Sequence, residues 1–133
     1  MIVADTNLIA YLLIHGPFTA GARAVYQKDP DWVAPPLWRS EFRNVLIQSL
    51  RHGLLSLLDA LELMGEAEEL MGGQEVESPS PRILRLAADS GCATYDCEFV
   101  ALAHDLNVPM VTSDRTLITR FKPSVVSMKT FCS

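Results

Sequence analysis

Short apolar runs alternate with longer amphipathic stretches along this chain. Residues 2–4 (IVA) and 108–113 (VPMVTS) have the composition of buried strands, and residues 124–131 (SVVSMKTF) predict a last strand. QEVE at 74–77 is a short strand candidate, whereas DPDWVAPP at 29–36 is expected to be a connector. The predicted strands therefore lie far apart along the chain.

Helical periodicity and capping residues fill the intervals between these strands. The helical segments are 7–13 (NLIAYLL), 19–27, 37–51, Ser56 to the Gly72-Gly73 pair, Ser80 to Gly91, Thr94 through Asp105, and the short turn 115–121. Ser56 with Asp59 three residues on resembles a capping box, and Thr94 is expected to cap its helix. The apolar side of the helix after Ser56 is expected to hold Leu57, Leu58, Leu61, Met64 and Leu70.

Strands separated by helical segments favour an α/β fold. Because parallel strands need long crossovers, we expect a mostly parallel sheet with helices on both faces. A chain of 133 residues is long enough for one core without disulfide or metal staples, so we expect a single domain over 1–133.

Composition restricts the class of protein further. Hydrophobic residues make up 49%, but no apolar run reaches the roughly 18 residues that a membrane span needs. No signal-peptide pattern is present, and the three cysteines form no disulfide framework or C-x-x-C zinc spacing. We therefore expect a cytoplasmic protein without membrane contact or structural zinc.

The net charge of −5 argues against a nucleic-acid partner until its distribution is considered. Seven acids and no Lys or Arg lie between Asp59 and Glu77, which predicts a solvated helix face or a docking surface for a basic segment. Outside that stretch, 11 basic residues face 9 acidic ones, a balance of +2. The acidic stretch thus accounts for the negative total.

Two aspartates follow predicted parallel strands. Asp5 comes directly after residues 2–4, and Asp114 follows the strand that includes Val108 to Thr112. Ligands of open α/β sheets bind beyond the carboxyl ends of the strands. Either aspartate alone could serve as a turn or helix cap, but two at equivalent places suggest a shared site.

Glu41 shares the apolar side of predicted helix 37–51 with Leu37, Trp38, Phe42 and Val45. A carboxylate that faces a core is costly unless it is paired or metal-bound. An arginine or backbone partner would also explain it, but Arg39 and Arg43 point to the opposite side of the helix. Asp96 lies in the first turn of its predicted helix, where the dipole alone favours an acid, and near the same sheet edge.

These four acids would meet at one rim without a lysine or histidine, so they would repel one another unless a cation is present. Clustered oxygens suit Mg²⁺ or Mn²⁺, and such a site is suited to phosphodiester hydrolysis. The glycine motifs of dinucleotide-binding and P-loop proteins are absent. Asn7 breaks the D-x-D pattern of aspartate-nucleophile phosphatases, and the acid and lysine pattern of receiver domains is not matched.

The segments VADTNLIAYLL, SEFRNVL and TYDCEFVALAHDLNVPMVTSD, with acids in the order Asp, Glu, Asp, Asp, resemble a PIN-domain ribonuclease of the VapC toxin type over essentially the whole chain. The resemblance implies that Asp5, Glu41, Asp96 and Asp114 are catalytic. Asp5, Asp96 and Asp114 would bind Mg²⁺ (or Mn²⁺) directly, and Glu41 would act through water or on a second ion. Thr6, Asn7 and Thr112 would support the acids or the substrate, although Thr6 and Asn7 could simply shape the turn.

The resemblance also implies an RNA substrate, a homodimer and a cognate antitoxin protein that blocks the site. A non-catalytic RNA- or protein-binding module is the alternative, and it would require the acids to be dispersed or salt-bridged. Arg115, next to Asp114, is a candidate for RNA contact.

Overall fold

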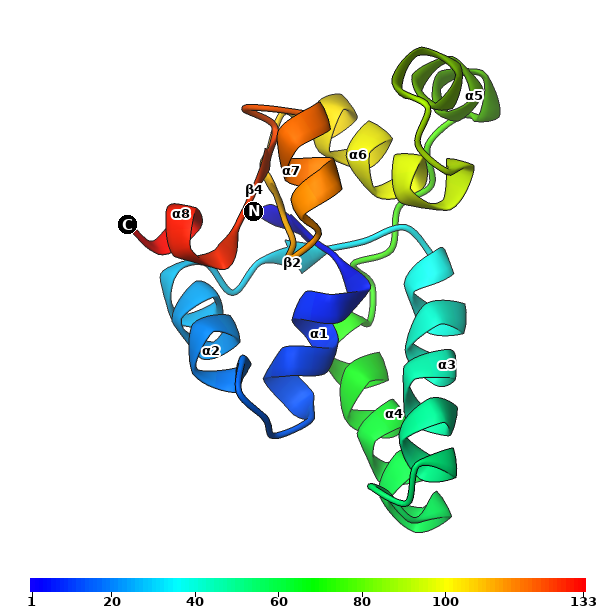
Figure 1. Cartoon of the computed structure of the whole chain (residues 1–133), viewed down its shortest axis with the longest axis vertical. Coiled ribbons are helices and arrows are strands. Elements are labelled where there is room, and N and C mark those ends of the chain that lie inside the picture. The colour runs from blue at the N-terminus through cyan, green and yellow to red at the C-terminus, as the bar shows by residue number, and fades with distance from the viewer.

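The computed structural model describes residues 1–133 as one α/β domain (Figure 1). Its strands are β1 (Ile2–Ala4), β2 (Trp32–Val33), β3 (Met110–Val111) and β4 (Val125–Val126). Its helices are α1 (Thr6–Leu13), α2 (Thr19–Lys28), α3 (Leu37–Arg51), α4 (Leu57–Met71), α5 (Ser80–Ser90), α6 (Thr94–Leu106), α7 (Arg115–Arg120) and α8 (Met128–Cys132). The α/β prediction is confirmed.

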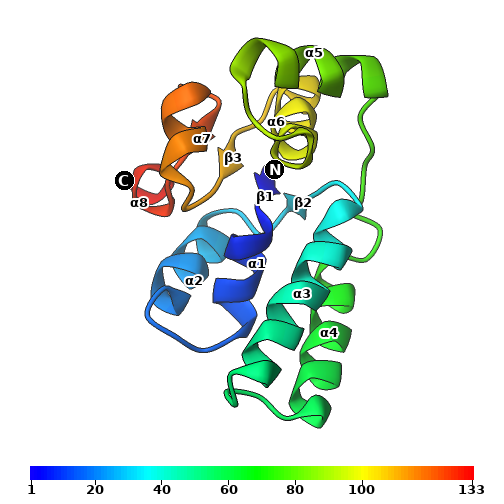
Figure 2. The ribbon, with the colours of Figure 1, turned by 45° about the vertical axis from the view of Figure 1, so that its right-hand side comes forward.

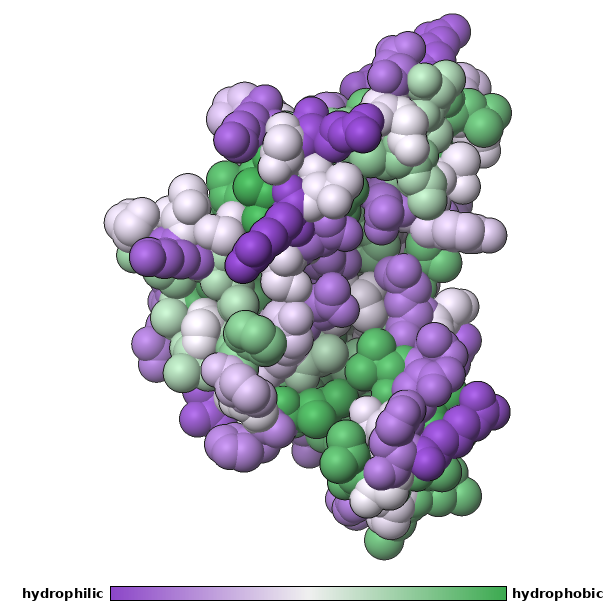
Figure 3. All heavy atoms as spheres, viewed as in Figure 1, coloured by the Kyte–Doolittle hydropathy of each residue, from purple (hydrophilic) through white to green (hydrophobic).

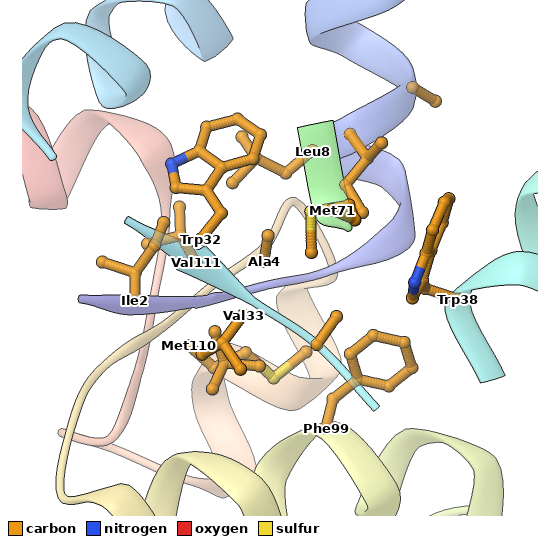
Figure 4. Close-up of a cluster of buried hydrophobic side chains, with 14 of the residues drawn as sticks. Ile2, Ala4, Leu8, Trp32, Val33, Trp38, Met71, Phe99, Met110 and Val111 are labelled. Carbon is orange, nitrogen blue, oxygen red and sulfur yellow. The ribbon is translucent and has the colours of Figure 1, made fainter. Parts of the chain in front are cut away.

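The four strands form one parallel sheet in the order β2-β1-β3-β4. Every strand residue except Val126 is buried, as expected for a parallel sheet covered on both faces. Figure 4 shows Leu8 of α1 and Phe99 of α6 approaching the strands from opposite sides. The core is therefore built around the sheet, and its carboxyl edge is the place where the loops can form a site.

Local signals placed most helix boundaries correctly. Residues 37–51 form α3 as predicted, and Ser56 and Asp59 form a full capping box at the start of α4. Gly91 ends α5 with φ +73°, a conformation that glycine adopts without strain. Thr94 is the first residue of α6 rather than its cap, because Ala93 occupies the N-cap position and no side chain caps this helix.

Helices α3 and α4 form a hairpin that extends away from the sheet (Figures 1 and 2). Arg39 in the first turn of α3 pairs with Glu68 of α4 at 2.7 Å and with Glu75, in the segment that follows α4, at 2.6 Å. The predicted apolar side of α4 is wrong in part, because Leu57, Leu58 and Leu61 are more than 60% exposed. The small residues Ala60 and Ala67 face the core with Met71 instead, which lets α4 pack closely.

Three strand predictions need correction. The connector 29–36 contains β2, because Trp32 and Val33 pair with Ile2 and Val3 of β1. QEVE contributes only an isolated bridge between Glu75 and Ala34. Residues 124–131 begin as β4 but continue as helix α8, which Ser127 caps by accepting a hydrogen bond from the Thr130 amide.

No helix combines the length and the apolar character that crossing a bilayer requires.

Candidate metal-binding active site

A polar pocket of about 250 Å³ lies at the carboxyl edge of the sheet. β1 pairs with β2 on one side and with β3 on the other, so the chain leaves a crevice between the ends of β1 and β3. The pocket is lined by Asp5, Thr6, Asn7, Glu41, Asn44, Val45, Asp96 and Asp114. All four acids predicted from the sequence therefore line one pocket.

Asp5 is the N-cap of α1 as well as a member of this pocket. One carboxylate oxygen accepts the Thr6 amide at 2.7 Å, and the other accepts the Thr112 hydroxyl at 2.5 Å. Burial raises the pKa of Asp5, these two hydrogen bonds lower it, and the charges of Asp96 and Asp114 raise it again. Asp5 thus forms the turn, and it does so within an acidic environment.

Glu41 accepts a hydrogen bond from the Thr6 hydroxyl at 2.7 Å. Its partner is therefore neither an arginine nor the backbone. Burial is the main cause that raises the pKa of Glu41, and the nearby charges of Asp5, Asp96 and Glu98 raise it further. Thr6 supports two acids at once, through its amide to Asp5 and its hydroxyl to Glu41.

Asp96 and Asp114 occupy the starts of two different helices. Asp96 lies in the first turn of α6, and burial followed by the charge of Asp114 raises its pKa. Asp114 is the N-cap of α7, where it accepts the Leu117 amide at 3.1 Å. The buried Thr112 hydroxyl accepts the Asp114 amide at 3.0 Å and donates to Asp5, so it connects the acids that follow β1 and β3.

The donor set of this pocket fits a hydrated divalent cation. The four acids form no ion pair, and no Lys, Arg or His lines the pocket. No three Asp, Glu, His or Cys side chains lie close enough to hold one ion directly between them. Mg²⁺ keeps several waters and needs only one or two carboxylates, and a carboxylate has lone pairs beyond those used by its protein donors. The residues therefore fit an ion that is bound partly through water.

Asn44 and Glu98 were not singled out by sequence reasoning, and Val45 was named only for the apolar side of its helix. Asn44 and Val45 line the pocket, and their position one turn after Glu41 on α3 was the signal that would have found them. Glu98 lies outside the pocket lining but raises the pKa of Glu41. Of the predicted supporting residues, Thr6 and Asn7 line the pocket, whereas Thr112 acts from beneath through its hydrogen bonds.

The model of the PIN domain family matches residues 2–121. The fold is similar to the crystal structure of PAE2754 from Pyrobaculum aerophilum, with a TM-score of 0.76 and 20% sequence identity over 98% of this chain and 92% of that one. A comparison with curated proteins found no match. The family match over most of the sequence shows that this chain belongs to the PIN-domain family, whose members are generally nucleases and typically use divalent metal ions.

Proposed function

We propose that this PIN domain is a metal-dependent endoribonuclease that hydrolyses RNA phosphodiester bonds. The observation that carries the proposal is that Asp5, Glu41, Asp96 and Asp114 line one pocket. No Lys, Arg or His side chain is among the other lining residues. Three of these acids have raised pKa values, which means that their ionised forms are disfavoured in the folded protein and that a divalent cation would stabilise them.

Asp5, Asp96 and Asp114 would hold Mg²⁺ or Mn²⁺ partly through bound water, since no three acids lie close enough to ligate one ion directly, and Glu41 would act through water. When bound, such an ion neutralises phosphate charge and lowers the pKa of the attacking water. Glu41, with its raised pKa and its hydroxyl partner, would accept a proton from the attacking water. Asn7 and Asn44 offer amide donors at the pocket wall for phosphate oxygens.

RNA cleavage by the wild type and by the Asp5→Asn variant, with Mg²⁺ or Mn²⁺, tests this function. Asparagine is also a good N-cap, so the variant should fold while cleavage falls at least a hundredfold. Asp89→Asn, on the exposed side of α5 and outside the pocket, is the matched control and should cleave normally. Equal cleavage by the wild type and Asp5→Asn, or no cleavage by the wild type with any divalent ion, would refute the proposal.

A non-catalytic RNA- or protein-binding module is the second candidate. It is favoured by the absence of any three acids at direct metal-binding distance, and by the capping roles of Asp5 and Asp114. Such a module would bind RNA equally well with EDTA and with Mg²⁺. The absence of any ion pair at Glu41 speaks for the enzyme instead.

We further propose that the enzyme is the toxin of a VapBC-type pair, a cytoplasmic homodimer that a separate antitoxin blocks. The α3–α4 hairpin supports a protein interface, because it exposes the apolar side chains Leu54, Leu57, Leu58 and Leu61. Sedimentation velocity of the wild type and Leu58→Glu would test the dimer. A wild-type monomer at micromolar concentration would refute it, and a small antitoxin-like reading frame beside the gene would support the pairing.

A further inference from the structure

A second hollow of about 230 Å³ adjoins the acidic pocket. It lies between the end of α1, the loop that leads to α2, and the middle of α3. Val45 lines both the hollow and the acidic pocket, so the two are neighbours along α3. Figure 3 shows hydrophobic residues gathered between α1 and α3, below hydrophilic residues near the centre of the view.

Two aromatic rings form one wall of this hollow. Phe18 is 51% exposed. The centroid of its ring lies 4.8 Å from the centroid of the Tyr11 ring, and the two ring planes meet at 39°. The Tyr11 hydroxyl is hydrogen-bonded to Ser113 at 3.0 Å, and Ser113 directly precedes Asp114. The exposed Phe18 ring is therefore supported by a ring that is tied to the rim of the acidic pocket.

The chemistry of the hollow contrasts with that of the pocket beside it. No Asp, Glu, Lys or Arg lines the hollow. Its hydroxyls are already used, because Thr19 donates to the Ile14 carbonyl and Ser49 donates to the Val45 carbonyl. The hollow thus offers an apolar surface and an aromatic face, with His15 as the polar side chain left at its edge.

We propose that this hollow is a nucleobase subsite of the ribonuclease, in which an unpaired base next to the scissile phosphate stacks on Phe18. The inference rests on the proposed function, because it needs the phosphate in the acidic pocket. Single-stranded RNA presents a neutral planar base beside each charged phosphate, which matches an apolar hollow next to a cation-binding pocket. Because few polar groups are free, stacking dominates and the subsite accepts more than one base identity.

Steady-state cleavage of a single-stranded RNA dodecamer that contains all four bases tests the subsite. Phe18→Ala should raise KM roughly 5- to 140-fold, the range that follows from loss of one stacked base, with kcat within about twofold. Phe18→Trp should keep the wild-type KM because it retains an aromatic face. Leu84→Ala, which removes an exposed leucine from α5 away from the hollow, is the matched control.

Dodecamers with single abasic positions separate stacking from a structural effect. An abasic nucleotide beside the cleavage site should weaken binding to the wild type but add no loss in Phe18→Ala. Cleavage by the wild type together with an unchanged KM in Phe18→Ala would overturn the nucleobase subsite but not the proposed function. The aromatic wall would then be a contact for a protein side chain instead. A wild type that neither cleaves nor binds the dodecamer with Mg²⁺ or Mn²⁺ would overturn the proposed function and the subsite together.

Discussion

Thr6 organises the acidic pocket at the level of a single side chain. It follows Asp5 in the turn after β1, is almost fully buried, and donates its hydroxyl to Glu41. A hydroxyl at this position donates one hydrogen bond to the carboxylate, and the other lone pairs of that carboxylate remain free to face the pocket. Thr6 therefore sets the direction in which Glu41 presents its charge.

Thr6→Val should lower the free energy of unfolding by about 1 kcal/mol, because Glu41 loses its only hydrogen-bond donor. The same change should raise the pKa of Glu41 further, since the Thr6 hydrogen bond lowers it. We expect RNA cleavage to fall 10- to 100-fold, the usual cost of removing a group that positions a ligand. Urea unfolding and cleavage rates measure the two effects. Unchanged cleavage in a stable Thr6→Val protein would contradict this role.

Asp96 is the acid of the four that makes no hydrogen bond to protein, so its charge is the easiest to remove. Without metal, Asp96→Asn should raise the free energy of unfolding by a few tenths of a kcal/mol, because burial and Asp114 oppose its ionisation. Thermal unfolding with EDTA and with Mg²⁺ checks this. Mg²⁺ should stabilise the wild type but much less the variant; equal stabilisation would remove Asp96 from the ion site.

Helix boundaries were predictable because their signals are local. The capping box at Ser56, the glycine at the end of α5 and the apolar stripe of α3 each act within a few residues. The strand β2 carries no such signal, although the apolar composition around β3 and β4 did predict strands there. β2 was missed because Trp32 and Val33 lie among Asp and Pro residues, and only pairing with β1 makes them a strand.

The candidate site was foreseen for a different reason. Asp5 and Asp114 follow strands that became neighbours, and parallel pairing brings their carboxyl ends to one edge whatever the strand length. The hydrogen bonds of Thr6 and Thr112, and the extra acid Glu98, depend on side-chain directions that periodicity does not give. The exposed leucines of α4 were misplaced because the pattern cannot tell a core face from a free apolar face.

At the scale of one helix, the capping box predicts a separable effect on stability. Ser56→Ala removes the hydroxyl that accepts the Asp59 amide at 3.0 Å and should cost about 1 kcal/mol. The α3–α4 hairpin should loosen at its far end, while the acids of the pocket keep their positions. Chemical denaturation and a cleavage assay check this together. A large loss of cleavage at full folding would show that the end of the hairpin is coupled to the site.

Over the whole molecule, the raised pKa values of Asp5, Glu41 and Asp96 link stability to pH. A carboxyl with a raised folded pKa favours the folded state below its unfolded value, near pH 4, and this contribution is lost as pH rises through the folded pKa. In EDTA, the Glu41→Gln/Asp96→Asn variant should therefore gain stability over the wild type from about pH 4 to neutrality.

Melting curves of both proteins across that range measure the difference in stability between them. Asp29 and Asp59 have lowered pKa values and so shift stability in the opposite direction with pH, but they are present in both proteins and drop out of the difference. Saturating Mg²⁺ at neutral pH should reverse the order. A stability advantage of the variant that becomes smaller as pH rises in EDTA would contradict this link between stability and pH.

The charge distribution also sets how RNA binding should respond to salt. Arg115 is exposed, free of ion pairs and adjacent in sequence to the pocket residue Asp114. One such phosphate contact contributes about −0.7 to the slope of the logarithm of the RNA-binding constant against the logarithm of the salt concentration. Arg115→Gln should therefore make this slope shallower by about 0.7, whereas Arg85→Gln on α5 should not. Fluorescence anisotropy titrations over a salt series measure it.

The Thr112 hydroxyl accepts a hydrogen bond from the Asp114 amide and donates one to the Asp5 carboxylate. Two carboxylates that arrive on separate strands are thereby aligned through a shared atom. Anyone redesigning this protein for another ion would have to move both acids together, because a shift at one strand end is passed to the other through Thr112. Asp5 and Asp114 therefore move together, and the metal preference of the pocket depends on both of them.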